Sequence, residues 1–302
     1  MKPKISVLFP VGDRIVFLVE ALESVLNQTF QDFELLAALD GVSDPVRKLV
    51  NDYQDPRIKV IDLPVCLGVG NARNAALATA AAPYIALMDT DDIAMPDRLK
   101  RQYDWMQAHP DVTVCGSNSI KQLEDGRQVS MKYPETDGMI KSRLLMVDSA
   151  VLNPTAMFRT GFVKQHRLFY DPNFKRDEDH RFFVEMMRLG AHFYGIQEEL
   201  LLYRRHSGNL TKDQTWFDIC KKRVREILLP VFFPLLSGEE SAVLLKGMQR
   251  QVHLTFDEAC LFVTAINKAV QENRSFMGED RQELRRILAR FYQRVLSSVQ
   301  KQ

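Results

Sequence analysis

The sequence YIALMDTDD, residues 84–92, joins a run of apolar residues to a cluster of aspartates. A short apolar run that ends at polar residues is typical of a buried strand. Residues two apart in an extended segment point to the same side, so Asp89 and Asp91 are expected to face one ligand. Carboxylates and substrate phosphates are preferred ligands of Mg2+ and Mn2+, so this stretch predicts a metal site at a strand end. The alternative is that Asp91 or Asp92 caps a helix beginning near Pro96.

Comparable patterns lie on both sides of this stretch. Strands are expected at residues 5–9, 33–39, 58–63 and 112–115, with helices from about residue 15 to 26 and from about 70 to 80. Repeated β-α-β units form a mainly parallel sheet flanked by helices. Because ligands bind beyond the carboxyl ends of such strands, we expect an α/β fold with its site at that edge.

The pattern of apolar residues changes after about residue 140. The pattern is less regular from about residue 140 to 210, and after residue 211 it is entirely helical. Ser237-x-x-Glu240 and Thr255-x-x-Glu258 have the spacing of capping boxes. The length of 302 residues favours one large domain with an appendage. We therefore predict an α/β domain over residues 1–210, which carries the expected ligand site, and an all-α C-terminal appendage over residues 211–302.

Composition excludes several classes of protein. The chain has 40 Lys and Arg against 39 Asp and Glu, so no overall basic field attracts nucleic acid. The longest apolar run, residues 227–236, is too short to span a bilayer. The N-terminal apolar residues are interpreted as a first strand rather than a signal peptide. The four cysteines are widely separated, which predicts neither a zinc site nor disulfides and favours the cytoplasm.

Three other features leave alternatives open. Gly68-x-Gly70-x-x-Arg73 is a broken dinucleotide fingerprint, better interpreted as a helix start that carries Arg73 toward an anion, or as a helix entry with a solvated Arg73. The acids of residues 177–179 either cap a helix or supply a general base. His206 is either a ligand or a packed or surface histidine.

In order, these segments resemble the family 2 glycosyltransferases, over about residues 3–210. The segments that match the family pattern are residues 5–11 (ISVLFPV), 21–34, 40–41, 72–75, 89–93, 153–155 (NPT), 178–179 and 201–206 (LLYRRH). The resemblance implies a nucleotide-sugar-binding domain of the glycosyltransferase-A fold. It also implies transfer of a sugar from a nucleotide diphosphate donor to an acceptor hydroxyl, with inversion at the anomeric carbon.

The resemblance also implies roles for individual residues. Asp89 and Asp91 would bind Mn2+ or Mg2+, and Asp179 would be the catalytic base with Glu178 beside it. His206 falls where relatives place a metal or diphosphate contact. The implied donor-binding residues are Pro10, Asp40 at the base, Arg73 near the nucleotide or diphosphate, Asp89 and Thr90.

Two positions depart from the family pattern. Gly12 stands where the family usually has an aromatic residue, and Leu39 replaces the first of two acids. Both changes fall in the expected nucleotide pocket, so a UDP-sugar is the expected donor without being fixed by these residues. They also keep a non-catalytic nucleotide-sugar-binding protein as an alternative, which the presence of Asp179 disfavours. A dinucleotide-dependent oxidoreductase is a second alternative, disfavoured because the fingerprint is broken and does not follow the first strand.

The resemblance points to bacterial surface polysaccharide or lipopolysaccharide synthesis, with a saccharide or lipid-linked saccharide as acceptor. The last helix carries a basic face beside an apolar stripe. Its arginines are Arg281, Arg285, Arg286, Arg290 and Arg294, and its stripe is Leu284, Ile287, Leu288, Phe291 and Val295. Such a helix either makes a peripheral membrane contact or packs its stripe on neighbouring helices or on a second subunit of a homodimer.

Overall fold

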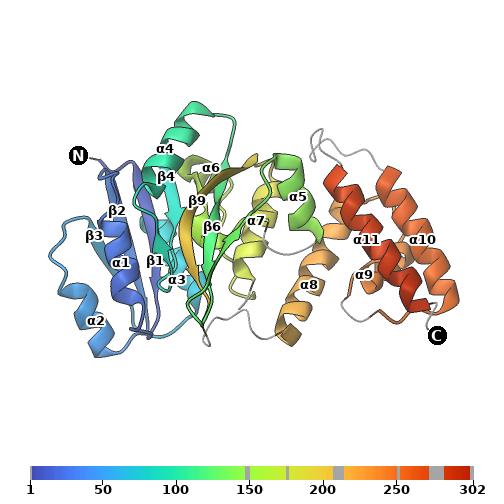
Figure 1. The fold of residues 1–302 in the computed structure, drawn as a ribbon, viewed down its shortest axis with the longest axis horizontal. Helices are drawn as coiled ribbons and strands as arrows, with labels where there is room; N and C mark the ends of the chain where they lie inside the picture. The colour runs from blue at the N-terminus through green and yellow to red at the C-terminus, as the bar shows by residue number, and fades with distance from the viewer. Residues whose placement is uncertain are drawn as a thin grey trace. The chain divides into compact units, whose positions relative to one another are not determined.

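The computed structural model describes residues 2–146, 150–174, 177–206, 214–249, 252–271 and 282–299 (Figure 1). It divides into two compact units, Met1–Glu135 with Val151–Asn209, and Thr136–Ala150 with Leu210–Gln302. The second unit therefore takes in residues 136–150, which the sequence analysis placed with the first 210 residues. The first unit carries every residue that the sequence assigned to a site.

The described part of the first unit is built on a nine-stranded sheet in the order β3-β2-β1-β4-β8-β6-β9-β5, with β7 paired to β6. Its strands are β1 (Ile5–Val11), β2 (Phe33–Asp40), β3 (Ile58–Leu63), β4 (Tyr84–Leu87), β5 (Ile93–Ala94), β6 (Val114–Gln122), β7 (Gln128–Met131), β8 (Met157–Arg159) and β9 (Phe193–Arg204). The parallel pairs are β3–β2, β2–β1, β1–β4 and β6–β9. The three-residue β8 runs antiparallel between β4 and β6, and the pairs β5–β9 and β6–β7 are also antiparallel, so the sheet is mixed.

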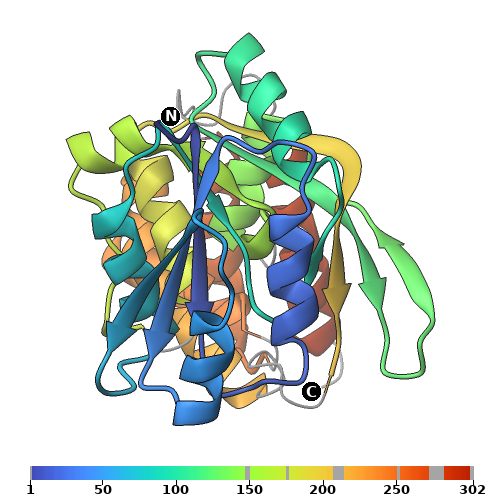
Figure 2. The ribbon, with the colours of Figure 1, turned by 90° about the vertical axis from the view of Figure 1, so that its left-hand side faces the viewer.

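Helices flank this sheet because its central strands are apolar on both faces. Every residue of β1, β2 and β4 is buried. The helices of the unit are α1 (Leu18–Leu26), α2 (Asp44–Asn51), α3 (Val69–Thr79), α4 (Arg98–Ala108), the 3-10 turn η1 (Asn153–Thr155), α6 (Thr160–Gln165) and α7 (Glu178–Arg188). The arrowheads of β1, β2 and β3 end at the same edge in Figure 2. The predicted α/β architecture is confirmed.

The second unit is helical over its described residues. Its helices are α5 (Asp137–Met146), α8 (Gln214–Phe232), α9 (Gly238–Gly247), α10 (Phe256–Gln271) and α11 (Gln282–Val299). Both predicted capping boxes are present. Glu240 N donates to Ser237 Oγ over 3.1 Å, Ser237 N donates to Glu240 Oε2 over 2.8 Å, and Thr255 and Glu258 repeat the pair.

The apolar stripe of α11 is a packing face within this unit. All five of its residues are buried, and the helix contacts α5 and α10. This is the alternative that needs no membrane, and a stripe that is already covered cannot also lie on a lipid surface. Of the five arginines, Arg281 lies outside the described residues. No helix in the described residues has the length and apolar character needed to cross a membrane.

Candidate active site

The loop after β3 is held tightly against the end of β2. Gly41 has a φ of +61°, and a Cβ placed there would lie 2.1 Å from Cys66 N, so the position requires glycine. The carboxylate of Asp40 accepts hydrogen bonds from Leu67 N over 2.7 Å and from Gly68 N over 2.8 Å. Asp40 therefore fixes the start of α3. Its contact with a nucleotide base stays a prediction.

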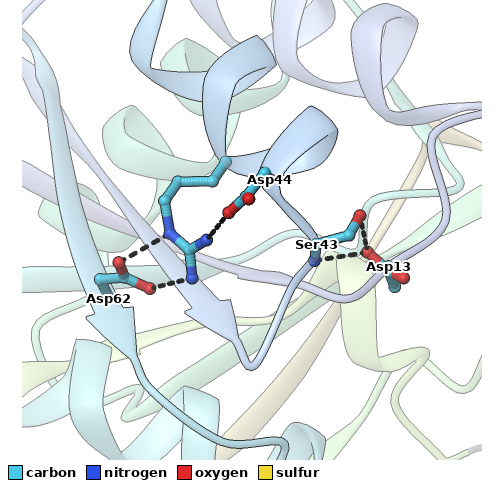
Figure 3. Close-up of polar contacts among 5 residues, drawn as sticks. Asp13, Ser43, Asp44 and Asp62 are labelled. Atoms are coloured by element: carbon cyan, nitrogen blue, oxygen red, sulfur yellow. Dashed lines mark hydrogen bonds and ion pairs between the residues drawn. The ribbon is translucent and has the colours of Figure 1, made fainter.

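A second set of polar contacts fixes the neighbouring loops (Figure 3). Asp13, after β1, accepts hydrogen bonds from Ser43 N over 2.8 Å and Ser43 Oγ over 2.6 Å, and these bonds lower the pKa of Asp13. Arg47 of α2 pairs with Asp44 and with Asp62 on β3, each at 2.9 Å. The loops after β1 and β2 are thus tied together at the edge where a donor is expected.

The residues that were expected in the nucleotide pocket differ in exposure. Pro10 is buried in β1, beyond Leu8, the last residue with a β4 partner, so its missing N–H is not needed on that side. Leu39 is buried in the core, where its side chain packs rather than lines a pocket. Gly12 is exposed, and a Cβ there would have no neighbour within 4 Å. Of the two departures, only Gly12 opens space at this edge.

Arg73 is buried between the two acidic motifs. Its side chain is 5% exposed, with Nη1 2.6 Å from Glu178 Oε1 and Nη2 2.8 Å from Asp89 Oδ1. Burial alone would lower the pKa of Arg73, but Asp89 and Glu178 raise it above its ordinary value. Its guanidinium also lies 5.6 Å from the centre of the Tyr170 ring. The interpretation of Arg73 as a solvated residue is wrong, and two carboxylates take its charge.

The helix α7 begins with the candidate base. Asp177 before it adopts a left-handed φ of 65°; its carbonyl accepts a hydrogen bond from Arg181 N over 3.0 Å, but its side chain does not cap the helix. Burial raises the pKa of Glu178 to about 7 even though Arg73 opposes the shift, and the charge of Asp179 adds to it. Asp179 is half-buried, and its Oδ1 accepts a hydrogen bond from His180 N over 2.7 Å. Asp179 thus combines a helix-terminal contact with an accessible carboxylate.

His206 contacts the other end of the acidic cluster. Its Nε2 lies 3.0 Å from Asp91 Oδ2, and its Nδ1 lies 3.1 Å from Arg14 Nη1. A guanidinium can only donate, so Nδ1 accepts a hydrogen bond from Arg14, and the protonated Nε2 donates one to Asp91 Oδ2. In this structure His206 therefore donates a hydrogen bond to Asp91, and its contact with a metal ion or a diphosphate stays a prediction.

The carboxylates of Asp89 and Asp91 suit a divalent cation whose remaining ligands come from a substrate. Among the residues that the structure describes, no three His, Cys, Asp or Glu side chains could hold a metal ion. The side chains of Asp89 and Asp91 are 26% and 27% exposed, and burial, together with the charge of Asp89, raises the pKa of Asp91. Mg2+ and Mn2+ are commonly held by one or two carboxylates together with phosphate oxygens and water, and these two aspartates suit that arrangement. Thr90 is half-buried between them.

The capping alternative for Asp91 and Asp92 is wrong. Helix α4 begins at Arg98, and Asp97 occupies the position before it. Asp92 is instead buried, with Oδ1 accepting a hydrogen bond from Arg204 N over 3.0 Å. Sequence reasoning did not assign a role to this contact.

Two further positions were also missed. Asn74 Oδ1 accepts a hydrogen bond from Tyr170 N over 2.7 Å, and its Nδ2 donates to Tyr170 O over 2.8 Å. The Tyr170 ring stacks on Phe182 of α7 with centroids 4.3 Å apart. Within α3, Arg73 therefore holds the first residue of α7 through Glu178, and Asn74 holds Tyr170, whose ring packs on Phe182 of the same helix. The signal was the position of Asn74 directly after Arg73 in the segment 72–75.

Comparisons with known proteins agree with this geometry. The family model described as glycosyl transferase family 2 matches residues 6–182. An uncharacterized glycosyltransferase of Methanocaldococcus jannaschii is 30% identical over 208 residues, 67% of this chain and 71% of that protein. The amylovoran biosynthesis glycosyltransferase AmsE of Erwinia amylovora is 27% identical over 207 residues, 66% of this chain and 74% of the relative.

The fold is also shared with a solved structure. The S. aureus TarS 1-349 complex with UDP-GlcNAc superposes with a TM-score of 0.61 at 18% identity, covering 99% of this chain and 92% of the TarS chain. That likeness shows the glycosyltransferase-A type fold. With the matched family model covering more than half of its length, the chain belongs to glycosyl transferase family 2.

Proposed function

We propose that this glycosyltransferase moves a sugar from a nucleotide diphosphate donor to an acceptor hydroxyl with inversion, and that Asp179 is its base. The carrying observation is the bridge from Glu178 through Arg73 to Asp89, with ion pairs of 2.6 Å and 2.8 Å. This bridge holds the first turn of α7 beside the acidic residues that follow β4. A base and a site for the departing diphosphate therefore share one edge of the sheet.

The chemistry follows from this placement. The acceptor oxygen attacks the anomeric carbon and forms the new glycosidic bond, while the bond to the diphosphate breaks and its electron pair leaves with the phosphate oxygen. Asp179 takes the proton of the acceptor hydroxyl through its carboxylate. Attack on the face opposite the leaving group inverts the anomeric configuration. Glu178, buried and paired with Arg73, holds the helix start rather than receiving this proton.

A divalent cation would be held by Asp89 and Asp91. When bound, Mn2+ or Mg2+ would neutralise charge on the diphosphate. Without it, the two carboxylates would face the donor phosphates with one guanidinium between Asp89 and Glu178 to balance them. His206 orients Asp91 by donating its Nε2 proton.

The donor and the pathway are inferred from similar proteins. The TarS structure holds UDP-GlcNAc, and AmsE is named for amylovoran biosynthesis, which supports a UDP-sugar donor and a role in surface polysaccharide synthesis. A saccharide or lipid-linked saccharide is the corresponding acceptor. The cytoplasmic location stays a prediction, as do a peripheral membrane contact and a homodimer that do not use the buried stripe of α11. The exposed Gly12 leaves room for bases other than uracil, so the nucleotide is the first property to measure.

The test is a panel of UDP-, GDP- and dTDP-sugars with Mn2+, followed by thermal shift, donor hydrolysis and calorimetry. We expect one nucleotide to raise the unfolding temperature in the presence of metal, because a ligand of the native state stabilises it. Asp91→Asn should weaken binding of that nucleotide with Mn2+ by roughly 10-fold or more, since it removes a charged ligand. Equal affinity with and without metal would contradict the assigned metal site.

The catalytic role of Asp179 needs its own variant. Asp179→Asn keeps the size and the bond to His180 N but cannot accept a proton, so transfer should fall by roughly 100-fold or more while donor binding persists. Glu178→Gln is the matched control and should reduce transfer less. Normal transfer by Asp179→Asn would move the base elsewhere, and no donor binding by the wild type would favour a different function altogether.

A further inference from the structure

Asp92 is a buried carboxylate with an incomplete set of partners. Its residue is 0% exposed, and Oδ1 accepts a hydrogen bond from Arg204 N over 3.0 Å. Its other oxygen, Oδ2, is buried and has no hydrogen-bond partner among the described residues. Burying a carboxylate with so few partners is unfavourable for folding, so its stabilising contribution does not explain its presence. A role in the geometry of the site does.

The place of Asp92 in the sheet shows what it holds. The short antiparallel pairing of β5 with β9 joins Ile93 to Leu202 and Ala94 to Leu201. Asp92 directly precedes β5, and its side chain reaches Arg204 N, two residues beyond Leu202, where the pairing of β9 with β5 ends. The carboxylate thus extends this pairing by one contact toward the carboxyl end of β9.

Other contacts hold the same strand end from different sides. Arg205 N donates to Gln122 O of β6 over 2.8 Å. The Arg204 guanidinium lies 4.8 Å from the centre of the Phe17 ring and pairs with Glu20. The Phe17 ring also lies 5.0 Å from the imidazole of His206. Asp92 is the contact that connects this strand end to the acidic motif itself.

We propose that Asp92 is a positioning residue that holds the backbone at Arg204 so that His206 lies against Asp91. His206 follows Arg204 by two residues, and its Nε2 reaches Asp91 Oδ2 over 3.0 Å. The path therefore leaves the acidic motif at Asp92 and returns to it at Asp91. The inference rests on the proposed function, because it assigns the contact a purpose in binding the donor with its cation.

The proposal predicts that Asp92 acts through His206. Loss of a residue that orients a metal ligand typically weakens metal affinity by roughly 10- to 100-fold. Asp92→Leu keeps the approximate volume but removes the acceptor, so Mn2+ affinity in the presence of the bound nucleotide should fall by about 10-fold. Asp92→Asn retains a carbonyl oxygen for Arg204 N and should stay within about 3-fold of the wild type, which makes it the matched rescue.

The experiment is a double-mutant cycle read by calorimetry and by electron paramagnetic resonance of Mn2+, with UDP or the nucleotide selected above. We expect Asp92→Leu to add less than about 2-fold to the loss caused by His206→Ala, because the two act on one contact. Fully additive losses, or equal losses for Asp92→Leu and Asp92→Asn, would overturn the proposal. Thermal unfolding of each variant establishes that the comparison is made on folded protein.

Two outcomes separate this inference from the proposed function. If the wild type binds no nucleotide with Mn2+, the proposed function fails before Asp92 is tested. If the wild type binds and the cycle is additive, the role of Asp92 fails alone. Should Asp92→Leu not fold, Asp92→Ser takes its place, since its shorter hydroxyl falls short of Arg204 N while the site stays polar.

Discussion

The two units bury arginines in opposite surroundings. Arg73 in the first unit lies between the carboxylates of Glu178 and Asp89. Arg225 in the second unit is 9% exposed and donates to Met248 O over 3.1 Å, while Arg294 donates to Gly247 O over 3.0 Å. Both acceptors are carbonyls at the end of α9, where cations are favoured by the helix dipole. Arg73 therefore connects two acidic motifs of the candidate site, whereas Arg225 and Arg294 bind the C-terminal carbonyls of a helix.

The largest expected effect comes from removing the arginine that bridges two acids. Arg73→Met leaves the buried Glu178 and the partly exposed Asp89 without their counter-charge, so the free energy of unfolding should fall by about 3 kcal/mol. Chemical denaturation measures that change, and donor binding should be lost with it. Arg73→Lys, with one point charge, should recover part of the stability and little of the transfer. If Arg73→Met were as stable as the wild type and still transferred sugar, the bridge between Glu178 and Asp89 would have no role in stability or activity.

The pH dependence of the first unit should follow Glu178. Burial raises the pKa of Glu178 from 4.5 to about 7, so between these values the native state holds a proton that the unfolded chain has lost. The Glu178 contribution to the free energy of unfolding therefore decreases as the pH rises through this window. Glu178→Gln should remove this component, so the variant gains stability relative to the wild type from pH 5 to pH 8. Parallel stability profiles would contradict the raised pKa.

The second unit should respond in the opposite direction at higher pH. Burial and the neighbouring Arg225 lower the pKa of Lys221 from 10.5 to about 7, so from about pH 7 to 10.5 the unfolded chain holds a proton that the native state lacks. The Lys221 contribution to the free energy of unfolding therefore increases with pH in that window. Lys221→Met should flatten this rise, and denaturation at pH 7 and pH 9 measures it. The partial exposure of Lys221 makes the effect smaller than that of Glu178.

The smallest effect is expected for the arginine that finishes a helix. Arg225→Met loses a bond to Met248 O but relieves repulsion from Arg294, so the free energy of unfolding should change by about 1 kcal/mol or less. Nucleotide binding and transfer should equal those of the wild type. A loss comparable to that of Arg73→Met would show that both units use buried arginines in the same way.

Local patterns predicted most of the fold. The spacing of apolar residues identified β1–β4 and α1, α3, α7 and α11, because these elements bury one face or both. The strand expected at residues 112–115 begins at Val114 and continues to Gln122, where polar side chains take over. The antiparallel insertion of β8 could not be predicted, since a strand of three residues carries too little periodicity and its partners are distant in sequence.

The candidate site was predicted in its residues but not in its contacts. Asp89, Asp91, Asp179 and His206 were identified from spacing and from the family resemblance. The two acidic motifs are connected because Arg73 contacts both Asp89, 16 positions further along the chain, and Glu178, 105 positions further along. No local sequence pattern indicates these two contacts. The same holds for Asp92, whose partner Arg204 lies 112 positions further along the chain. From sequence alone, Asp92 was interpreted as a possible helix cap, because its contact with Arg204 of β9 is visible only in the structure.

The close approach of Cys66 to Gly41 bears on how this enzyme can diversify. The backbone at Cys66 passes where a β-carbon at position 41 would lie, and Asp40 binds the next two N–H groups, so the path of this loop is fixed. Its outward side chains are free of that constraint, with Val65 58% and Leu67 52% exposed. Substitutions of Val65 and Leu67 are therefore expected to leave the path of the loop unchanged, whereas an insertion or deletion between β3 and α3 would displace the backbone that packs against Gly41.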